Sequence, residues 1–126
     1  AVTRLSLTFT MHVKAAYAST LYNHFMNQQT ITVVVAKDLE DLIPTFMANR
    51  TKELETLRTA LGAGDMEQLR QLGHRMKGVG NSYGFELISV LGKKIEDSAK
   101  IKDLSSLNAF IAEYMDYLAR VRLVYE

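Results

Sequence analysis

Residues 65–84 read DMEQLRQLGHRMKGVGNSYG, and the spacing of apolar residues in them is the clearest indication of the fold. Its apolar side chains recur at intervals of three and four residues, the spacing of one face of an α-helix. They are Leu69, Leu72, Met76, Val79 and Tyr83. Asp65 is suited to the start of this helix and Gly84 to its end. The stretch therefore predicts an amphipathic helix that buries one face.

His74 lies on the other face of this predicted helix. Each residue of a helix turns the chain by about 100°, so the residues nearest to His74 around the axis are polar or glycine. They are Arg70, Gln71, Lys77, Gly78 and Asn81. We therefore expect the imidazole of His74 to point to water, although most surface histidines have no special function.

Glycine is unusually frequent around this histidine. The glycines are Gly73, Gly78, Gly80 and Gly84. A glycine inside a helix costs about 1 kcal/mol relative to alanine. We interpret the group as space for a partner that must come close to the imidazole, with Gly78 leaving no side chain in the way. Gly84 is explained by helix termination alone, and glycine tolerated by chance is the alternative for the others.

Lys77 lies one helical turn after His74 on the same face. Its ammonium gains little beside a neutral imidazole. Beside a phosphoryl group with nearly two negative charges, the same ammonium would form a charge-assisted contact and stabilise the transition state. The pair is therefore suited to phosphoryl chemistry.

The rest of the chain after residue 37 also reads as helical. Asp38 is suited to an N-cap and Pro44 to a first turn, and Gly62 and Gly64 end this first helix. Two more helices are expected over residues 87–100 and from Asp103 or Ser105 onward, with the helical region reaching residue 124. Short loops between four amphipathic helices predict an all-α, antiparallel, up-down-up-down four-helix bundle.

Residues 1–36 have a mixed pattern, and we assign them as an N-terminal extension or linker of uncertain structure before a domain at 37–126. Apolar residues alternate with polar ones over 5–13, as in a half-buried strand, and recur at helical spacing over 17–25. Residues 31–35 are rich in β-branched side chains and are expected to be extended.

The composition excludes several classes of function. The chain of 126 residues has a net charge of +1 and no basic cluster, so nucleic acid is not an expected partner. It has no cysteine, which excludes disulfides, thiolate metal sites and cysteine nucleophiles. Its longest apolar run, residues 33–36, is far too short to span a membrane. We expect a cytoplasmic protein.

The run His74-Arg-Met-Lys77-Gly78, followed by Gly84 and by the pair Ile95-Glu96, resembles the signature of histidine phosphotransfer (HPt) domains of bacterial two-component phosphorelays. The resemblance implies that His74 is phosphorylated on its outer ring nitrogen. It implies that Lys77 supports the phosphoryl group, that Gly78 clears the approach, and that Glu96 orients the imidazole or a water.

The resemblance also implies the reaction and the partners. His74 would accept a phosphoryl group from a receiver-domain aspartate and pass it to another receiver aspartate. The partners would be a response-regulator receiver domain and a hybrid sensor kinase. No cofactor is expected on this chain, since the receiver would supply Mg²⁺. The chain carries no glycine-rich nucleotide loop, so we expect a phosphocarrier without kinase activity of its own.

The expected docking surface surrounds His74, and we expect the protein to be a monomer. Its candidate partner-binding residues are Arg70, Arg75, Gly80, Asn81, Ser82 and Lys93. One alternative is a helical interaction module that binds a signalling partner without phosphotransfer. A second is a metal or haem bundle, but no metal site is expected because the predicted bundle holds one histidine, which faces outward. A histidine-kinase core would have an acidic residue where this chain has Arg75.

Overall fold

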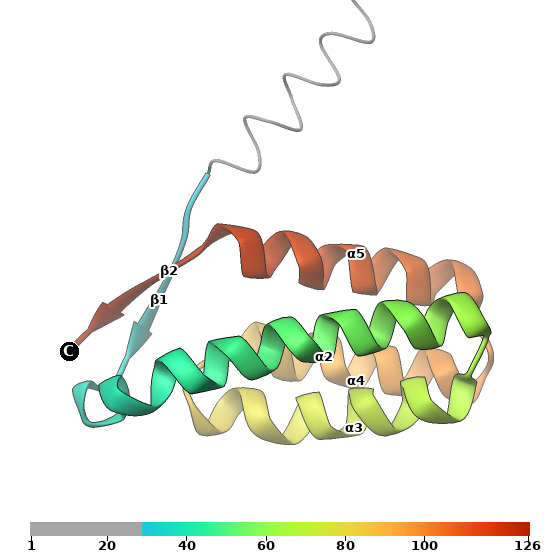
Figure 1. The fold of residues 1–126 in the computed structure, drawn as a ribbon, viewed down its shortest axis with the longest axis horizontal. Coiled ribbons are helices and arrows are strands. Elements are labelled where there is room, and N and C mark those ends of the chain that lie inside the picture. The colour runs from blue at the N-terminus through green and yellow to red at the C-terminus, as the bar shows by residue number, and fades with distance from the viewer. Residues whose placement is uncertain (1–28) are drawn as a thin grey trace, which may run out of the picture. The chain divides into compact units, whose positions relative to one another are not determined.

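The structure is a computed structural model that describes residues 29–126. The strand-like pattern at 5–13 and the helical spacing at 17–25 lie outside the described residues. The elements are β1 (Ile31–Val35), a 3₁₀ helix η2 (Lys37–Leu42), α2 (Ile43–Ala63), α3 (Met66–Ser82), α4 (Glu86–Lys100), α5 (Leu104–Arg120) and β2 (Val121–Tyr125) (Figure 1).

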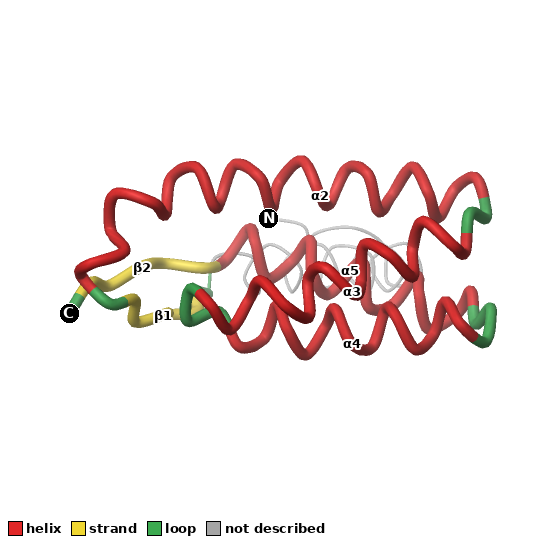
Figure 2. The backbone as a smooth tube through the Cα atoms, turned by 90° about the horizontal axis from the view of Figure 1, so that it is seen from below, coloured by secondary structure: helices red, strands yellow, loops and turns green. Residues whose placement is uncertain are grey.

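Helices α2 to α5 form an antiparallel bundle. Each helix runs back along the one before it, and the connections alternate between the two ends of the bundle (Figures 1 and 2). Large apolar side chains of all four helices fill the core, including Leu57, Met76, Ile95 and Tyr114, each with no more than 1% of its surface exposed. The predicted all-α four-helix bundle is therefore confirmed.

Three helix ends were predicted correctly from local signals in the sequence. The Asp65 carboxylate accepts a hydrogen bond of 3.1 Å from the backbone N–H of Gln68, and Asp103 accepts one of 3.1 Å from the N–H of Ser106. Each bond satisfies one of the N–H groups that a helix start leaves without a partner. Gly64 ends α2 in the left-handed conformation, with φ of 66°.

The predicted N-cap at Asp38 was wrong. Asp38 lies within η2, and α2 begins only at Ile43 with Leu42 at its N-cap and no side-chain cap. Pro44 explains the late start, because it lacks an N–H and is tolerated in the first turn of a helix but not in its interior. A continuous helix from residue 38 would have placed Pro44 in that interior.

The predicted end of the last helix was also wrong. Helix α5 stops at Arg120, and Val121 takes an extended conformation with ψ of 137°. Strand β2 then pairs in parallel with β1, in a register that runs from Ile31 opposite Val121 to Val35 opposite Tyr125. Residues 121–125 alternate between more and less buried positions, and their β-branched valines favour a strand once a partner strand is available.

This parallel pair of strands, β1–β2, lies at one end of the bundle (Figure 2). Two further backbone bonds continue it, from Lys37 N–H to Glu126 O at 2.9 Å and from Glu126 N–H to Val35 O at 3.1 Å. Val35 is fully buried in the core. The extended conformation predicted for residues 31–35 is confirmed, and the compact unit around the bundle comprises Ile31–Glu126.

Candidate functional site

The imidazole of His74 stands on the surface of α3 with one nitrogen held by α4. The side chain is 63% exposed, which agrees with the outward face predicted for it. Its Nδ1 atom lies 2.8 Å from Oε2 of Glu96. Glu96 is only 4% exposed, because the close packing of α3 on α4 covers it. The ring is thus accessible on one side and fixed on the other.

Lys77 completes a three-residue cluster. Its Nζ atom donates a hydrogen bond of 3.1 Å to Oε1 of Glu96, and its side chain is 42% exposed. The two oxygens of one carboxylate therefore bind two different partners on α3. His74 and Lys77 are held side by side by a residue from the neighbouring helix.

Glu96 is ionised in this arrangement. Burial raises its pKa, but the hydrogen bonds from Lys77 and His74, together with the charges of Lys77 and Lys100, outweigh burial and leave the pKa below its ordinary value. An ionised carboxylate only accepts hydrogen bonds. The Nδ1 atom of His74 must therefore carry the proton, and in the neutral ring the Nε2 atom then has a free lone pair.

Glycine brings α3 and α4 close enough for this contact. A Cβ atom on Gly73 would lie 2.6 Å from the backbone N of Glu96, and one on Gly92 would lie 2.5 Å from the backbone N of Lys77. Contacts this short do not occur, so any side chain there would force the helices apart. Gly80 has the same function near the end of the pair, where a Cβ would lie 2.7 Å from the backbone of Ser89.

The interpretation of these glycines as space for a partner is therefore corrected for Gly73 and Gly80. Both are buried against α4. Gly78 differs, since it is exposed and a Cβ atom there would have nothing within 4 Å. Gly84 ends the α3 region with φ of 88°, as its position predicts. The packing function of Gly92 was not predicted from the sequence, although a glycine inside the third predicted helix was a signal for it.

Comparison with known proteins identifies the family. The family model of the Hpt domain matches residues 41–123, which include all three residues of the cluster. The chain belongs to the Hpt domain family. It is also similar to the crystal structure of histidine-containing phosphotransfer protein B (HptB) from Pseudomonas aeruginosa PAO1, with 32% identity and a TM-score of 0.59 over 62% of this chain and 68% of that one. A search of curated proteins found no match.

Membership of the Hpt domain family establishes the general function. Hpt domains are phosphocarriers in phosphorelays and are not kinases, and their partners are receiver domains and kinases. No helix within residues 29–126 is long and apolar enough to cross a membrane. The same residues bring together no group of three His, Cys, Asp or Glu side chains that could hold a metal ion.

The docking residues expected on this Hpt domain have different environments. Arg75, Asn81 and Ser82 are exposed. Arg70 already pairs with Glu67 through two hydrogen bonds, of 3.0 and 2.5 Å. Lys93 pairs with Asp97 at 3.1 Å.

Gly80 is not on the surface of this Hpt domain, so its predicted role in partner binding was wrong. It sits where the end of α3 meets Ser89, and the Ser89 Oγ atom accepts a hydrogen bond of 2.9 Å from the N–H of Asn81. The prediction failed because rotation around one helix does not show which glycine faces a neighbouring helix.

An open hollow of about 420 Å³ lies beside the cluster, between α3 and α4. Its lining combines three lysines, two acidic residues and one partly exposed valine. The lining residues are Lys77, Asn81, Glu86, Ser89, Val90, Lys93, Lys94 and Asp97. Among the predicted docking residues, Asn81 and Lys93 thus line the same hollow as Lys77.

Proposed function

We propose that His74 accepts a phosphoryl group from a receiver-domain aspartate and passes it to an aspartate of another receiver. One observation carries the proposal: the exposed imidazole has its Nδ1 atom 2.8 Å from a buried carboxylate oxygen. Because an ionised carboxylate can only accept a hydrogen bond, this contact holds the ring proton on Nδ1 and leaves the lone pair on Nε2. A neutral imidazole with a free lone pair is a nucleophile without the help of a general base.

The proposed transfer exchanges one bond for another. The lone pair of Nε2 attacks the phosphorus of the aspartyl phosphate, and the N–P bond forms as the P–O bond to the aspartate breaks. The electron pair of that bond leaves with the aspartate carboxylate. The imidazole ring becomes positively charged, and the Glu96 carboxylate 2.8 Å from Nδ1 stabilises this charge. The return step reverses each change.

Lys77 and Gly78 assist from the same helix. Phosphoryl transfer depends mainly on positioning and on neutralising the charge of the phosphoryl oxygens. The Lys77 ammonium lies one turn from His74 and can move from Glu96 to those oxygens, while Gly78 presents bare backbone to the incoming receiver. In this proposal the receiver supplies Mg²⁺ and its acidic pocket, and this chain acts as a monomer in the cytoplasm.

The experiment compares two variants with the wild-type protein in a transfer assay from a phosphorylated receiver. His74→Gln should keep the helical circular dichroism spectrum and accept no acid-labile phosphate. Lys77→Ala should fold normally and accept phosphate up to about tenfold more slowly, since it loses one stabilising cation in the transition state.

Acid-labile phosphate on the His74→Gln variant would disprove the assignment of the site. A wild-type protein that binds the receiver tightly but takes up no phosphate would instead support an interaction module without phosphotransfer.

A further inference from the structure

Phosphorylation of His74 would give the Lys77 ammonium two competing partners, the Glu96 carboxylate and the phosphoryl group. In the free protein, the Lys77 ammonium is bound to Glu96 Oε1 at 3.1 Å. The proposed function requires the same ammonium to approach the phosphoryl oxygens on Nε2. If Lys77 moves there, a carboxylate that is 96% buried loses one of its two hydrogen-bond partners. A buried charge left without a partner is costly.

Lys100 is placed to resolve this conflict. It is the last residue of α4, four residues after Glu96, so the two side chains lie on the same face of the helix. A glutamate followed by a lysine at this spacing is the favourable order for a helical ion pair. Lys100 is exposed, and within residues 29–126 no salt bridge to its ammonium is present. Its positive charge already acts on the Glu96 carboxylate.

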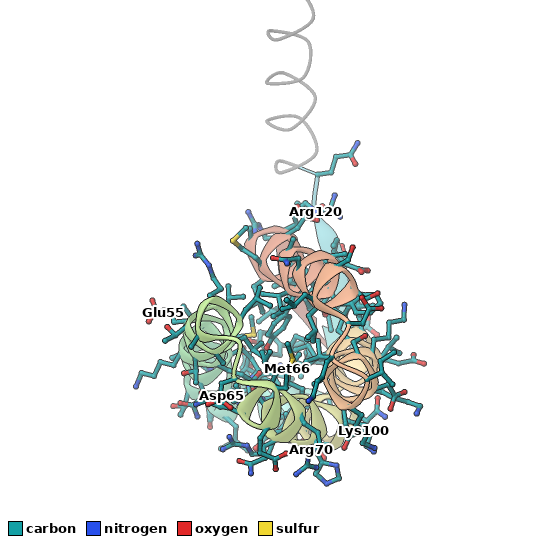
Figure 3. The ribbon with its side chains drawn as sticks, turned by 90° about the vertical axis from the view of Figure 1, so that its right-hand side faces the viewer. Glu55, Asp65, Met66, Arg70, Lys100 and Arg120 are labelled. Carbon is teal, nitrogen blue, oxygen red and sulfur yellow. The ribbon has the colours of Figure 1, made fainter. Side chains whose placement is uncertain are left out.

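Arg70, another cation on which the charge of Glu96 acts, is already paired. Figure 3 shows Arg70 on α3 and Lys100 on α4 at neighbouring flanks of the two helices. The Arg70 guanidinium makes two hydrogen bonds to Glu67 on its own helix, at 3.0 and 2.5 Å. Arg70 would have to give up both to reach Glu96, whereas the Lys100 ammonium has no salt bridge to give up within residues 29–126.

We propose that Lys100 is the second counter-ion of Glu96: when Lys77 turns to the phosphoryl group, the Lys100 ammonium takes its place at the carboxylate. Lys100 is thus a positioning residue that acts through Glu96. It keeps the carboxylate compensated, which in turn keeps the Nδ1–H of His74 bound and the phosphorylated ring in its orientation. This inference rests on the proposed function of His74.

The test phosphorylates the full chain with potassium phosphoramidate. This reagent needs no docked receiver, so any change in the phosphorylation rate reflects the site itself. The phosphoryl group moves from the nitrogen of the reagent to Nε2, and ammonia leaves. Lys100→Gln should slow phosphorylation about two- to fivefold, the value of an exposed ion pair. Lys100→Arg should restore the wild-type rate, because it keeps the charge.

Lys94→Gln is the matched control. It removes the same charge from the same helix, and although Lys94 lines the hollow beside the cluster, its ammonium lies over the ring of Phe110 on α5. Its phosphorylation rate should equal that of the wild-type protein. A loss of rate in both glutamine variants would overturn the proposal, since it would then reflect only the net charge of α4.

A second measurement distinguishes an exchange of partners from a structural role at the helix end. NMR signals of lysine ammonium groups report which lysine is hydrogen-bonded. In the free protein the Lys77 ammonium should be the protected one, and after phosphorylation the Lys100 signal should become protected as well. Glu96→Gln should abolish this second change. A Lys100 signal that is the same in both states would overturn the proposal.

The outcomes separate this inference from the proposed function. If phosphohistidine forms on His74 and the Lys100→Gln rate equals that of the wild-type protein, only the role of Lys100 is disproved. If no phosphohistidine forms on His74 from phosphoramidate or from a phosphorylated receiver, both proposals are disproved.

Discussion

At the scale of the residue, Glu96 determines how His74 is presented. The carboxylate reaches the imidazole from the neighbouring helix, and its two oxygens bind His74 and Lys77 at 2.8 and 3.1 Å. The lowered pKa of Glu96 keeps it ionised, so that it fixes the proton of the ring on Nδ1. A surface histidine without such a partner would exchange between two tautomers and many orientations.

We predict that Glu96→Gln changes the pH dependence of stability. Folding lowers the pKa of the Glu96 carboxyl. The ionised carboxylate therefore stabilises the fold at pH values above its pKa in the unfolded chain, about 4.3. This contribution is lost as the pH falls through the lower pKa of the folded state. At pH 7 the free energy of unfolding of the variant should be about 1–2 kcal/mol below that of the wild-type protein. Its unfolding free energy, measured with urea from pH 7 to 3, should also fall less steeply than that of the wild-type protein.

Asp97→Asn is the control for this prediction. Asp97 is an exposed carboxylate next to Glu96 in the sequence, and within residues 29–126 its ion-pair partner is Lys93. Removing its charge should leave the dependence of the unfolding free energy on pH close to that of the wild-type protein. Parallel curves for Glu96→Gln and the wild-type protein would show that Glu96 is not stabilised in its ionised form.

At the scale of the element, the pairing of α3 with α4 sets the distance between His74 and Glu96. Gly73 and Gly92 lie where the two helices pack closely, and neither leaves room for a Cβ atom. Gly78, on the same helix as Gly73, faces open space instead. Glycine at position 73 therefore serves helix packing, whereas the function proposed for Gly78 is to give the receiver access to the site.

Two alanine variants should separate these functions. Gly73→Ala should lower the unfolding free energy by about 2–3 kcal/mol, because its Cβ atom would overlap the backbone of α4. Gly78→Ala should raise it by about 0.5–1 kcal/mol, because alanine is the better helix former and meets no neighbour. Urea unfolding measures both changes.

The same Gly78→Ala variant tests the access function. If bare backbone at this position clears the approach of the receiver, the more stable variant should transfer phosphate more slowly. A Gly78→Ala variant with an unchanged transfer rate would contradict that function while leaving the stability prediction intact.

At the scale of the whole molecule, the β1–β2 pair joins the N-terminal and C-terminal segments of the compact unit Ile31–Glu126. The parallel pairing links the segment before η2 to the segment after α5, and Val35 inserts its side chain fully into the core. A two-stranded sheet is marginal alone. Its stability must therefore come from packing against the bundle, which predicts that the strands unfold together with the helices.

We predict unequal effects for two neighbouring valines of β1. Val35→Ala should lower the unfolding free energy by about 1–3 kcal/mol, because it removes buried methyl groups from the core. Val34→Ala should change it by less than about 0.5 kcal/mol, because Val34 is 53% exposed. Equal and small effects in urea unfolding would show that β1 is not part of the cooperative unit.

The predictions from sequence succeeded where the signal was local. The apolar spacing of α3, the caps at Asp65 and Asp103 and the glycine at the end of α2 all act within a few residues. They failed at Asp38 and at residue 121, where local preferences competed with another feature. Pro44 delayed the start of α2, and a partner strand converted the expected end of α5 into β2.

By itself, the sequence determined the four-helix bundle, the outward face of His74 and the place of Lys77 beside it, because rotation and spacing along one helix are sufficient for these. The resemblance implied only that Glu96 orients the imidazole or a water. Tertiary contacts were needed to show that Glu96 binds both His74 and Lys77, that Gly73, Gly80 and Gly92 serve helix packing, and that β1 pairs with β2. These features depend on contacts between residues far apart in the chain, 22 positions for His74 and Glu96, and no local pattern encodes the distance at which two helices pack.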